Sequence, residues 1–145
     1  MIRISQILQS KAVNALYSVR SDNTVYEALV LMAEKNIGAV LVIDAGELVG
    51  IFSERDYARK VILKGRHSDD TTIGDVMTPN VITIAPESSI ESCMQIMAEK
   101  HIRHLPVMDT EKLIGIISIN DVVSTIIRDQ KAHINSLQSY ISGGY

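Results

Sequence analysis

Two short stretches of this chain place a glycine, a serine and an aspartate at the same spacing. They read GIFSERD, which ends at Asp56, and GIISIND, which ends at Asp121. In each stretch an apolar run stops at the serine, Ser53 or Ser118, and the aspartate follows three positions later. The pattern is typical of a capping box, in which the serine hydroxyl accepts a backbone N–H and the acid reaches back. A cap of this kind stabilises a helix by about 1 kcal/mol and requires no ligand.

The same residues would also suit a ligand that carries a sugar and a phosphate. A strand ends and a helix begins there, so free N–H groups and the positive end of the helix dipole collect at one point. Gly50 and Gly115 lie just upstream, where a missing side chain allows close approach to the backbone. An aspartate can accept hydrogen bonds from both hydroxyls of a ribose, each worth about 1.5 to 3 kcal/mol. Capping and ligand binding both stay open, and the motif alone favours capping.

The basic residues near the two stretches differ. Arg55, Arg59 and Lys60 follow the first serine, and the shared helix face of Arg55 and Arg59 could offset the aspartate beside a phosphate. A solvated, charged helix face is the simpler explanation. The second stretch carries uncharged residues at the matching positions, namely Asn120, Ser124 and Thr125.

The second stretch has its positive charge in another segment, HIRHLP. Arg103 and His104 stand there where the first copy has Gly38 and Ala39, which predicts two non-equivalent sites. His101 and His104 are three apart on an extended segment and point to opposite faces, so we expect no metal site. An enzyme needs a metal, a nucleophile with its base or a carboxylate pair. The sequence suggests none of these, so we predict no enzymatic activity.

A repeat must position these residues. At an offset of 65, positions 32–56 align with 97–121 without a gap. Each copy has a strand candidate (LYSV or VITI), an amphipathic helix capped at Thr24 or Ser89, two apolar runs, and a second helix that begins at the serine. The predicted fold class is α+β, with two β-α-β-β-α repeats packed as a pseudo-twofold pair. Cys93 falls in the apolar stripe of its helix, so we expect a buried, inert thiol.

The polar stretch between the copies gives the domain boundaries. We assign residues 1–64 to the first repeat with its lead-in, 65–72 to a linker, 73–130 to the second repeat and 131–145 to a C-terminal helical tail. The similar segments ISQILQS and IGDVMTP, the first and second lead-in, should form a helical turn or two. The tail either packs back on the module or lies between subunits, and we weigh these alternatives equally.

Composition excludes several classes of function. A chain of 145 residues that is 46% hydrophobic and 21% charged can bury a core. A net charge of −3 gives no basic footprint for nucleic acid. Since no apolar run approaches the roughly 18 residues of a membrane span, we expect no membrane partner and a cytoplasmic location.

The twofold pattern resembles a tandem pair of cystathionine-β-synthase (CBS) domains, a Bateman module. The motifs that carry this resemblance are GIFSERD, RHLPVMD and GIISINDVV. ERDYARKV and HIRHLPV resemble the small stand-alone bacterial members, and the resemblance covers residues 16–128. It implies a regulatory, signal-transduction module whose two clefts between the repeats bind AMP, ADP, ATP or NAD. S-adenosylmethionine is a weaker candidate. It also implies a homodimer, and it leaves room for an unidentified effector protein.

The resemblance assigns the ribose-binding aspartates to Asp56 and Asp121 and the preceding hydroxyls to Ser53 and Ser118, with arginines taking phosphates. The nucleotide-binding residues that it implies are, for the first site, Tyr17, Ser18, Gly38, Ala39, Val40, Ser53, Arg55, Asp56 and Arg59, and, for the second, Ile82, Thr83, Arg103, His104, Leu105, Pro106, Ser118, Asn120 and Asp121. Two alternatives stay open: a scaffold with vestigial clefts that acts through its C-terminal helix, and a small nucleotide-cleaving or nucleotide-transferring enzyme.

Overall fold

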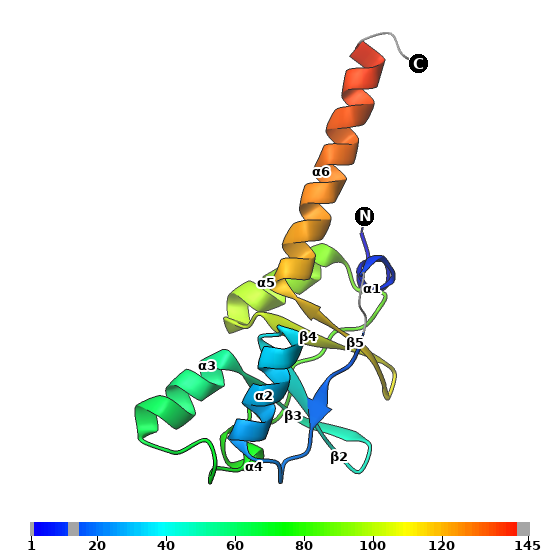
Figure 1. Ribbon diagram of the computed structural model, residues 1–145. Coiled ribbons are helices and arrows are strands. Elements are labelled where there is room, and N and C mark those ends of the chain that lie inside the picture. Colours follow the sequence, from blue (N-terminus) through cyan, green and yellow to red (C-terminus); the bar gives the residue numbers. More distant parts are fainter. Residues whose placement is uncertain (1, 12–14, 142–145) are drawn as a thin grey trace. The chain divides into compact units, whose positions relative to one another are not determined.

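The first repeat folds around a three-stranded sheet. The structure is a computed structural model that describes residues 2–11 and 15–141 (Figure 1). β1 (Ser18–Val19) pairs in parallel with β2 (Ala39–Asp44), and β2 pairs antiparallel with β3 (Glu47–Ser53), so that Ala39 lies opposite Ser53. Between β1 and β2 runs α2 (Val25–Lys35). α3 (Glu54–Asp56) follows β3 and continues into a π-helical turn (Tyr57–Val61) and a 3-10 turn (Ile62–Lys64).

The second repeat has the same order of elements. α5 (Ile90–Lys100) precedes β4 (His104–Asp109), which pairs antiparallel with β5 (Lys112–Ser118). The strand predicted in VITI is reduced to one parallel bridge, between Ile84 and Val107, at the position equivalent to the pairing of Val19 with Val42. α6 (Ile119–Ile141) follows β5 directly. The two β-α-β-β-α repeats of the predicted α+β fold are confirmed.

The predicted helix caps form as the spacing requires. The Thr24 hydroxyl accepts from the backbone N–H of Glu27 at 3.1 Å, and the Glu27 carboxylate accepts from the Thr24 N–H at 3.0 Å. Ser89 accepts from the backbone N–H of Ser92 at 3.1 Å. α2 and α5 therefore begin where the sequence predicts.

Each lead-in packs against the repeat that it does not precede. By their contacts the residues divide into a unit of residues 15–82, here the repeat-1 unit, and a unit of residues 1–14 with 83–145, the repeat-2 unit. The first lead-in forms α1 (Ile4–Ser10), which contacts β5 and α6, and the second forms α4 (Ile73–Val76), which contacts β3. The predicted boundaries follow the repeat in the sequence, whereas these contacts exchange the two lead-ins.

Each unit has its own hydrophobic core. In the repeat-2 unit, Ile4 and Ile7 of α1 are buried with Leu105, Ile117 and other apolar residues of the sheet and helices. The Cys93 side chain is fully buried in this core, as predicted, and burial raises the pKa of its thiol to about 11. The repeat-1 unit packs the apolar residues of α2, β2, β3 and α4 around Phe52.

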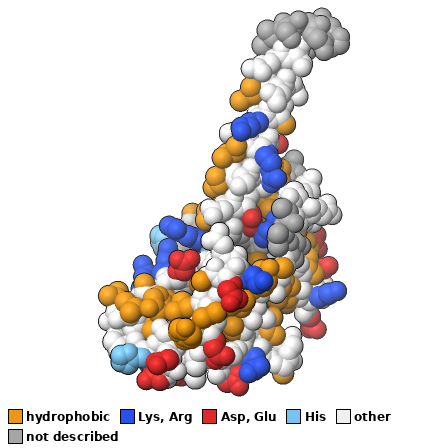
Figure 2. Space-filling view, in the orientation of Figure 1, with side chains coloured by type: hydrophobic (Ala, Val, Ile, Leu, Met, Phe, Trp, Pro, Cys, Tyr) orange, Lys and Arg blue, Asp and Glu red, His pale blue; other side chains and the backbone are white. Residues whose placement is uncertain are grey.

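α6 continues well past the β4–β5 sheet (Figure 1). Val122 and Thr125 in its first turns are buried, whereas residues 127–139 are all exposed. Figure 2 shows hydrophobic side chains recurring along this exposed length. Among the described helices, α6 included, there is none whose length and apolarity would let it span a bilayer.

Candidate functional site

Asp56 lies at the junction of β3 and α3, where the capping box is complete. The Ser53 backbone N–H donates to Asp56 Oδ2 at 3.0 Å, and the Asp56 N–H donates to Ser53 Oγ at 3.2 Å. The other carboxylate oxygen, Oδ1, accepts from Thr78 Oγ1 at 3.0 Å and pairs with Lys60 Nζ at 3.1 Å. Only 11% of the Asp56 side chain is exposed. Both oxygens of this carboxylate are therefore engaged inside the repeat-1 unit.

Gly50 is required by the close approach of the chain itself. A Cβ at this position would lie 2.5 Å from Met77 Sδ and 3.1 Å from the Thr78 carbonyl oxygen. Thr78 pairs with Ile51 of β3 through two backbone hydrogen bonds, of 3.0 and 2.8 Å. The missing side chain thus admits the end of the second lead-in, which carries the Thr78 hydroxyl to Asp56.

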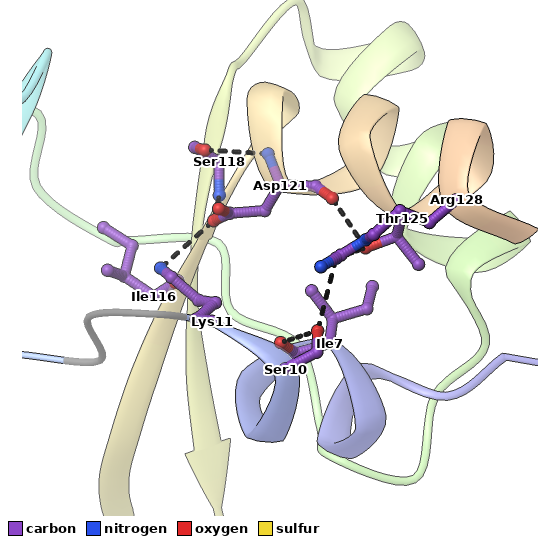
Figure 3. A network of polar contacts seen from close by, with 8 residues as sticks. All are labelled: Ile7, Ser10, Lys11, Ile116, Ser118, Asp121, Thr125 and Arg128. Carbon is purple, nitrogen blue, oxygen red and sulfur yellow. Dashed lines mark hydrogen bonds and ion pairs between the residues drawn. The ribbon is translucent and has the colours of Figure 1, made fainter.

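Asp121 occupies the equivalent junction of β5 and α6. The Ser118 N–H donates to Asp121 Oδ2 at 2.8 Å, and the Asp121 N–H donates to Ser118 Oγ at 3.2 Å. Lys11, just after α1, places its Nζ 3.1 Å from Asp121 Oδ2 and donates to the Ile116 carbonyl at 2.9 Å (Figure 3). Asp121 is more open than Asp56, with 21% of its side chain exposed.

A second set of contacts ties the end of α1 to the start of α6. Thr125 Oγ1 donates to the Asp121 carbonyl at 2.8 Å. Arg128 Nη2 lies 3.4 Å from both Ser10 Oγ and Thr125 Oγ1, and Ser10 Oγ donates to the Ile7 carbonyl at 2.9 Å (Figure 3). These bonds hold the backbone just before Lys11 in place beside the Asp121 site.

His104 flanks the Asp121 site from the neighbouring strand. It is the first residue of β4 and lies opposite Ser118 in the β4–β5 register. Burial lowers its pKa below 6.5; the charge of Asp121 opposes this shift, while the charges of Arg103 and Lys11 add to it. The site therefore combines the Asp121 carboxylate with the ammonium of Lys11, the nearby charge of Arg103 and an imidazole whose pKa is lowered.

The other predicted residues of the first site lie on the strands that lead to Ser53. Gly38 accepts the Glu54 N–H at 3.0 Å, which places the entry to β2 beside the start of α3. Val40 is a core residue, with no side-chain surface exposed. The remaining residues are Tyr17 before β1, Ser18 in β1, buried Ala39 in β2, and exposed Arg55 and Arg59 on α3 and the π-helical turn.

The other predicted residues of the second site follow the same plan. The Arg103 carbonyl accepts the Ile119 N–H at 2.8 Å, so this arginine stands at the start of α6. Leu105 is fully buried in the core. The remaining residues are Ile82 and Thr83 ahead of the Ile84 bridge, buried Pro106 in β4, and exposed Asn120 at the start of α6.

Sequence reasoning missed Lys11 and Thr78 altogether, and it treated Lys60 only as a charge near a phosphate. Both missed residues lie at the ends of the lead-ins, which the sequence marks as similar segments without indicating which repeat they touch. Within residues 2–11 and 15–141, no three His, Cys, Asp or Glu side chains are grouped so that they could hold a metal ion.

Comparison with known proteins places these features in a family. The profile of the CBS domain matches residues 4–63 and 73–128. The mitochondrial CBS domain-containing protein CBSX3 of Arabidopsis thaliana is 41% identical over 98% of this chain and 73% of its own length. A solved protein with CBS domains from Burkholderia ambifaria MC40-6 is 47% identical, with a TM-score of 0.86 over 88% of this chain and 96% of that one.

A third similar structure was solved with ligands. The CBS domain pair of protein MJ0100, in complex with 5′-methylthioadenosine and S-adenosyl-L-methionine, has a TM-score of 0.77 and 25% identity, covering 90% of this chain and 98% of that one. Both repeats of the sequence match the domain profile, and most of the fold matches the solved CBS-domain structures. The chain belongs to the CBS domain family and carries two CBS repeats.

Proposed function

We propose that this CBS pair is a regulatory module that binds an adenosine-containing ligand, AMP, ADP, ATP or NAD, at the Asp56 and Asp121 sites. The observation that carries the proposal is that both aspartates stand at a strand-to-helix junction with a lysine Nζ at 3.1 Å. The carboxylate supplies acceptors for a ribose diol, and the lysine removes the charge that would repel a phosphate. The adenosine ligands of the MJ0100 pair support the same ligand class.

The capping boxes do not compete with this function. Capping engages one carboxylate oxygen of each aspartate, Oδ2. A carboxylate has about four lone-pair positions, so among the described contacts Asp121 keeps Oδ1 for ligand hydroxyls. At Asp56 a ligand hydroxyl would have to share Oδ1 with Thr78 and Lys60 or displace the Thr78 hydroxyl. We therefore treat the cap as the device that holds the carboxylate in position and the diol as its ligand.

Calorimetric titration tests the proposal. AMP, ATP, NAD and S-adenosylmethionine are titrated into the wild type, Asp56→Asn and Asp121→Asn, with exposed Asp129→Asn on α6 as the matched control. Loss of one charge-assisted hydrogen bond costs about 1.5 to 3 kcal/mol, so each site variant should weaken its site by about 10- to 100-fold. Asp129→Asn should leave every affinity unchanged. The proposal fails if none of the four ligands binds the wild type.

A scaffold that acts through α6 is the second candidate. Val123, Ile127, Ile134 and Leu137 are 46% to 51% exposed. Their successive spacings of four, seven and three residues are those of the a and d positions of a heptad repeat. Helices in proteins are stabilised mainly by packing of their apolar face, so an exposed apolar stripe favours a partner for α6. We propose that α6 pairs with α6 of a second copy to form a homodimer, which presents the module to an effector protein.

Sedimentation with and without AMP separates the two candidates. A sensor should bind AMP and change its association state or shape with ligand. A scaffold should form the same α6-dependent assembly whether or not AMP is present, and should show no AMP binding by calorimetry.

A further inference from the structure

The two sites obtain their lysines from unlike places. Lys60 lies four residues after Asp56 on the same helical segment. The position equivalent to Lys60 in the second repeat is Thr125, which carries no charge and donates to the Asp121 carbonyl instead. Lys11 supplies the missing charge from the first lead-in, far away in the sequence. The pairing of aspartate with lysine is therefore kept although the residues that provide it differ.

Lys11 is fixed in this role by its surroundings. Its side chain is only 18% exposed, and its Nζ also donates to the Ile116 carbonyl at 2.9 Å. α1 anchors the segment because Ile4 and Ile7 are buried in the core of the repeat-2 unit. An ammonium has three donors. The contacts with Asp121 and Ile116 use two of them, so as far as the described residues go the third donor is available to a bound molecule.

We propose that Lys11 sets the charge selectivity of the Asp121 site, so that this site prefers adenosine ligands with an anionic group on the 5′ carbon over neutral or cationic ones. The inference rests on the proposed function and specifies its ligand class at one site. A bare carboxylate a few ångströms from a phosphate would weaken binding about tenfold in a partly exposed site, and Lys11 cancels that charge. Without Lys11, a cationic adenosine ligand would gain where an anionic one loses.

The test measures a ratio of affinities at one site. Calorimetry in the Asp56→Asn background gives the affinities for AMP, for adenosine and for S-adenosylmethionine, whose sulfonium is cationic. Lys11→Met should lower the ratio of the AMP affinity to the adenosine affinity about tenfold. It should raise the ratio of the S-adenosylmethionine affinity to the adenosine affinity. Lys11→Arg, which keeps the charge, should retain the wild-type ratios. Lys64→Met, the matched control at an exposed lysine of the 3-10 turn, should leave both ratios unchanged.

Each outcome bears on the proposal in a defined way. Equal changes for AMP and adenosine in Lys11→Met would overturn it, since they would show a structural role only. An Asp56→Asn protein that binds adenosine as tightly as AMP would also overturn it, and this measurement needs no change at Lys11. Lys11→Gln provides a second uncharged variant if Lys11→Met melts early. If the Asp56→Asn protein binds none of the three ligands, the Asp121 site of the proposed function is refuted instead.

Discussion

Replacing Gly50 by alanine should destabilise the protein, although the same change in an unconstrained strand would be tolerated. The new Cβ would meet Met77 Sδ at 2.5 Å and the Thr78 carbonyl oxygen at 3.1 Å. The end of the Met77 side chain can turn away. The Thr78 carbonyl is backbone and accepts the Ile51 N–H at 3.0 Å, so the second lead-in must shift by a few tenths of an ångström.

The expected magnitude follows from two opposing effects. Overpacking of a well-packed contact costs about 1 to 3 kcal/mol. Replacing glycine by alanine restricts the unfolded chain and returns about 0.4 to 1 kcal/mol. We expect the free energy of unfolding to fall by about 1 to 2 kcal/mol. With a urea dependence of about 2 kcal/mol per molar, the midpoint should fall by roughly 0.5 to 1 M.

A double-mutant cycle with Met77→Ala tests the cause. Part of the cost of Gly50→Ala should disappear in the Met77→Ala background, giving a coupling of about 1 kcal/mol. Gly65→Ala is the control, because φ is +69° there and no atom lies within 4 Å of its added Cβ; its cost comes from strain and should be the same in both backgrounds. The reasoning fails if Gly50→Ala is neutral or stabilising, or if its cost is independent of residue 77.

Three further predictions concern other parts of the chain. Burial lowers the pKa of His104 in the folded protein below 6.5, so the unfolded state binds more protons between the folded and the unfolded pKa. The free energy of unfolding in urea should therefore rise with pH through that window and level off above pH 6.5. His104→Gln should lose this pH dependence. Cys93, buried and with a thiol pKa of about 11, should react with a disulfide reagent at pH 8 only as fast as the protein opens, and at once in urea. Leu137→Lys should shift the sedimenting species toward monomer. It should not change the urea midpoint of unfolding, followed by the reactivity of the buried Cys93 thiol. Ser136→Lys, a similar charge at an exposed position, should leave the assembly intact.

The fold could be predicted because its signals are local and occur twice. The caps at Thr24 and Ser89 depend on residues three positions away, and the strand runs end at glycines or polar turns. The apolar run VITI predicts a longer strand than the structure has, since within it only Ile84 bridges to β4. Apolar composition alone cannot report whether a short run finds a partner along its whole length.

The charge partner of Asp121 could not be predicted, because it depends on a contact between distant segments, whereas Lys60 is only four residues from Asp56 in the sequence. The first lead-in aligns with the second at an offset of 69 rather than 65, so Lys11 has no obvious counterpart in the repeat. Nothing in the sequence states that α1 packs on β5 and α6. From the sequence alone, a lysine after a short helix is interpreted as a solvated charge. Only the packing of α1 shows that the Nζ of Lys11 lies 3.1 Å from Asp121 Oδ2.

The two sites are thus alike in charge and unlike in the acceptors that they can offer. Asp56 uses Oδ2 for its cap and Oδ1 for Thr78 and Lys60. Asp121 makes its contacts with Ser118 and Lys11 through Oδ2, as far as the described residues are concerned, and it is twice as exposed. The diol of the proposed ligand would meet Oδ1 of Asp121 without displacing either contact, whereas at Asp56 it would have to share an oxygen with Thr78 or replace its hydroxyl. Equivalent positions in the repeat therefore need not have equal affinity, and the exchange of lead-ins is the physical source of the difference.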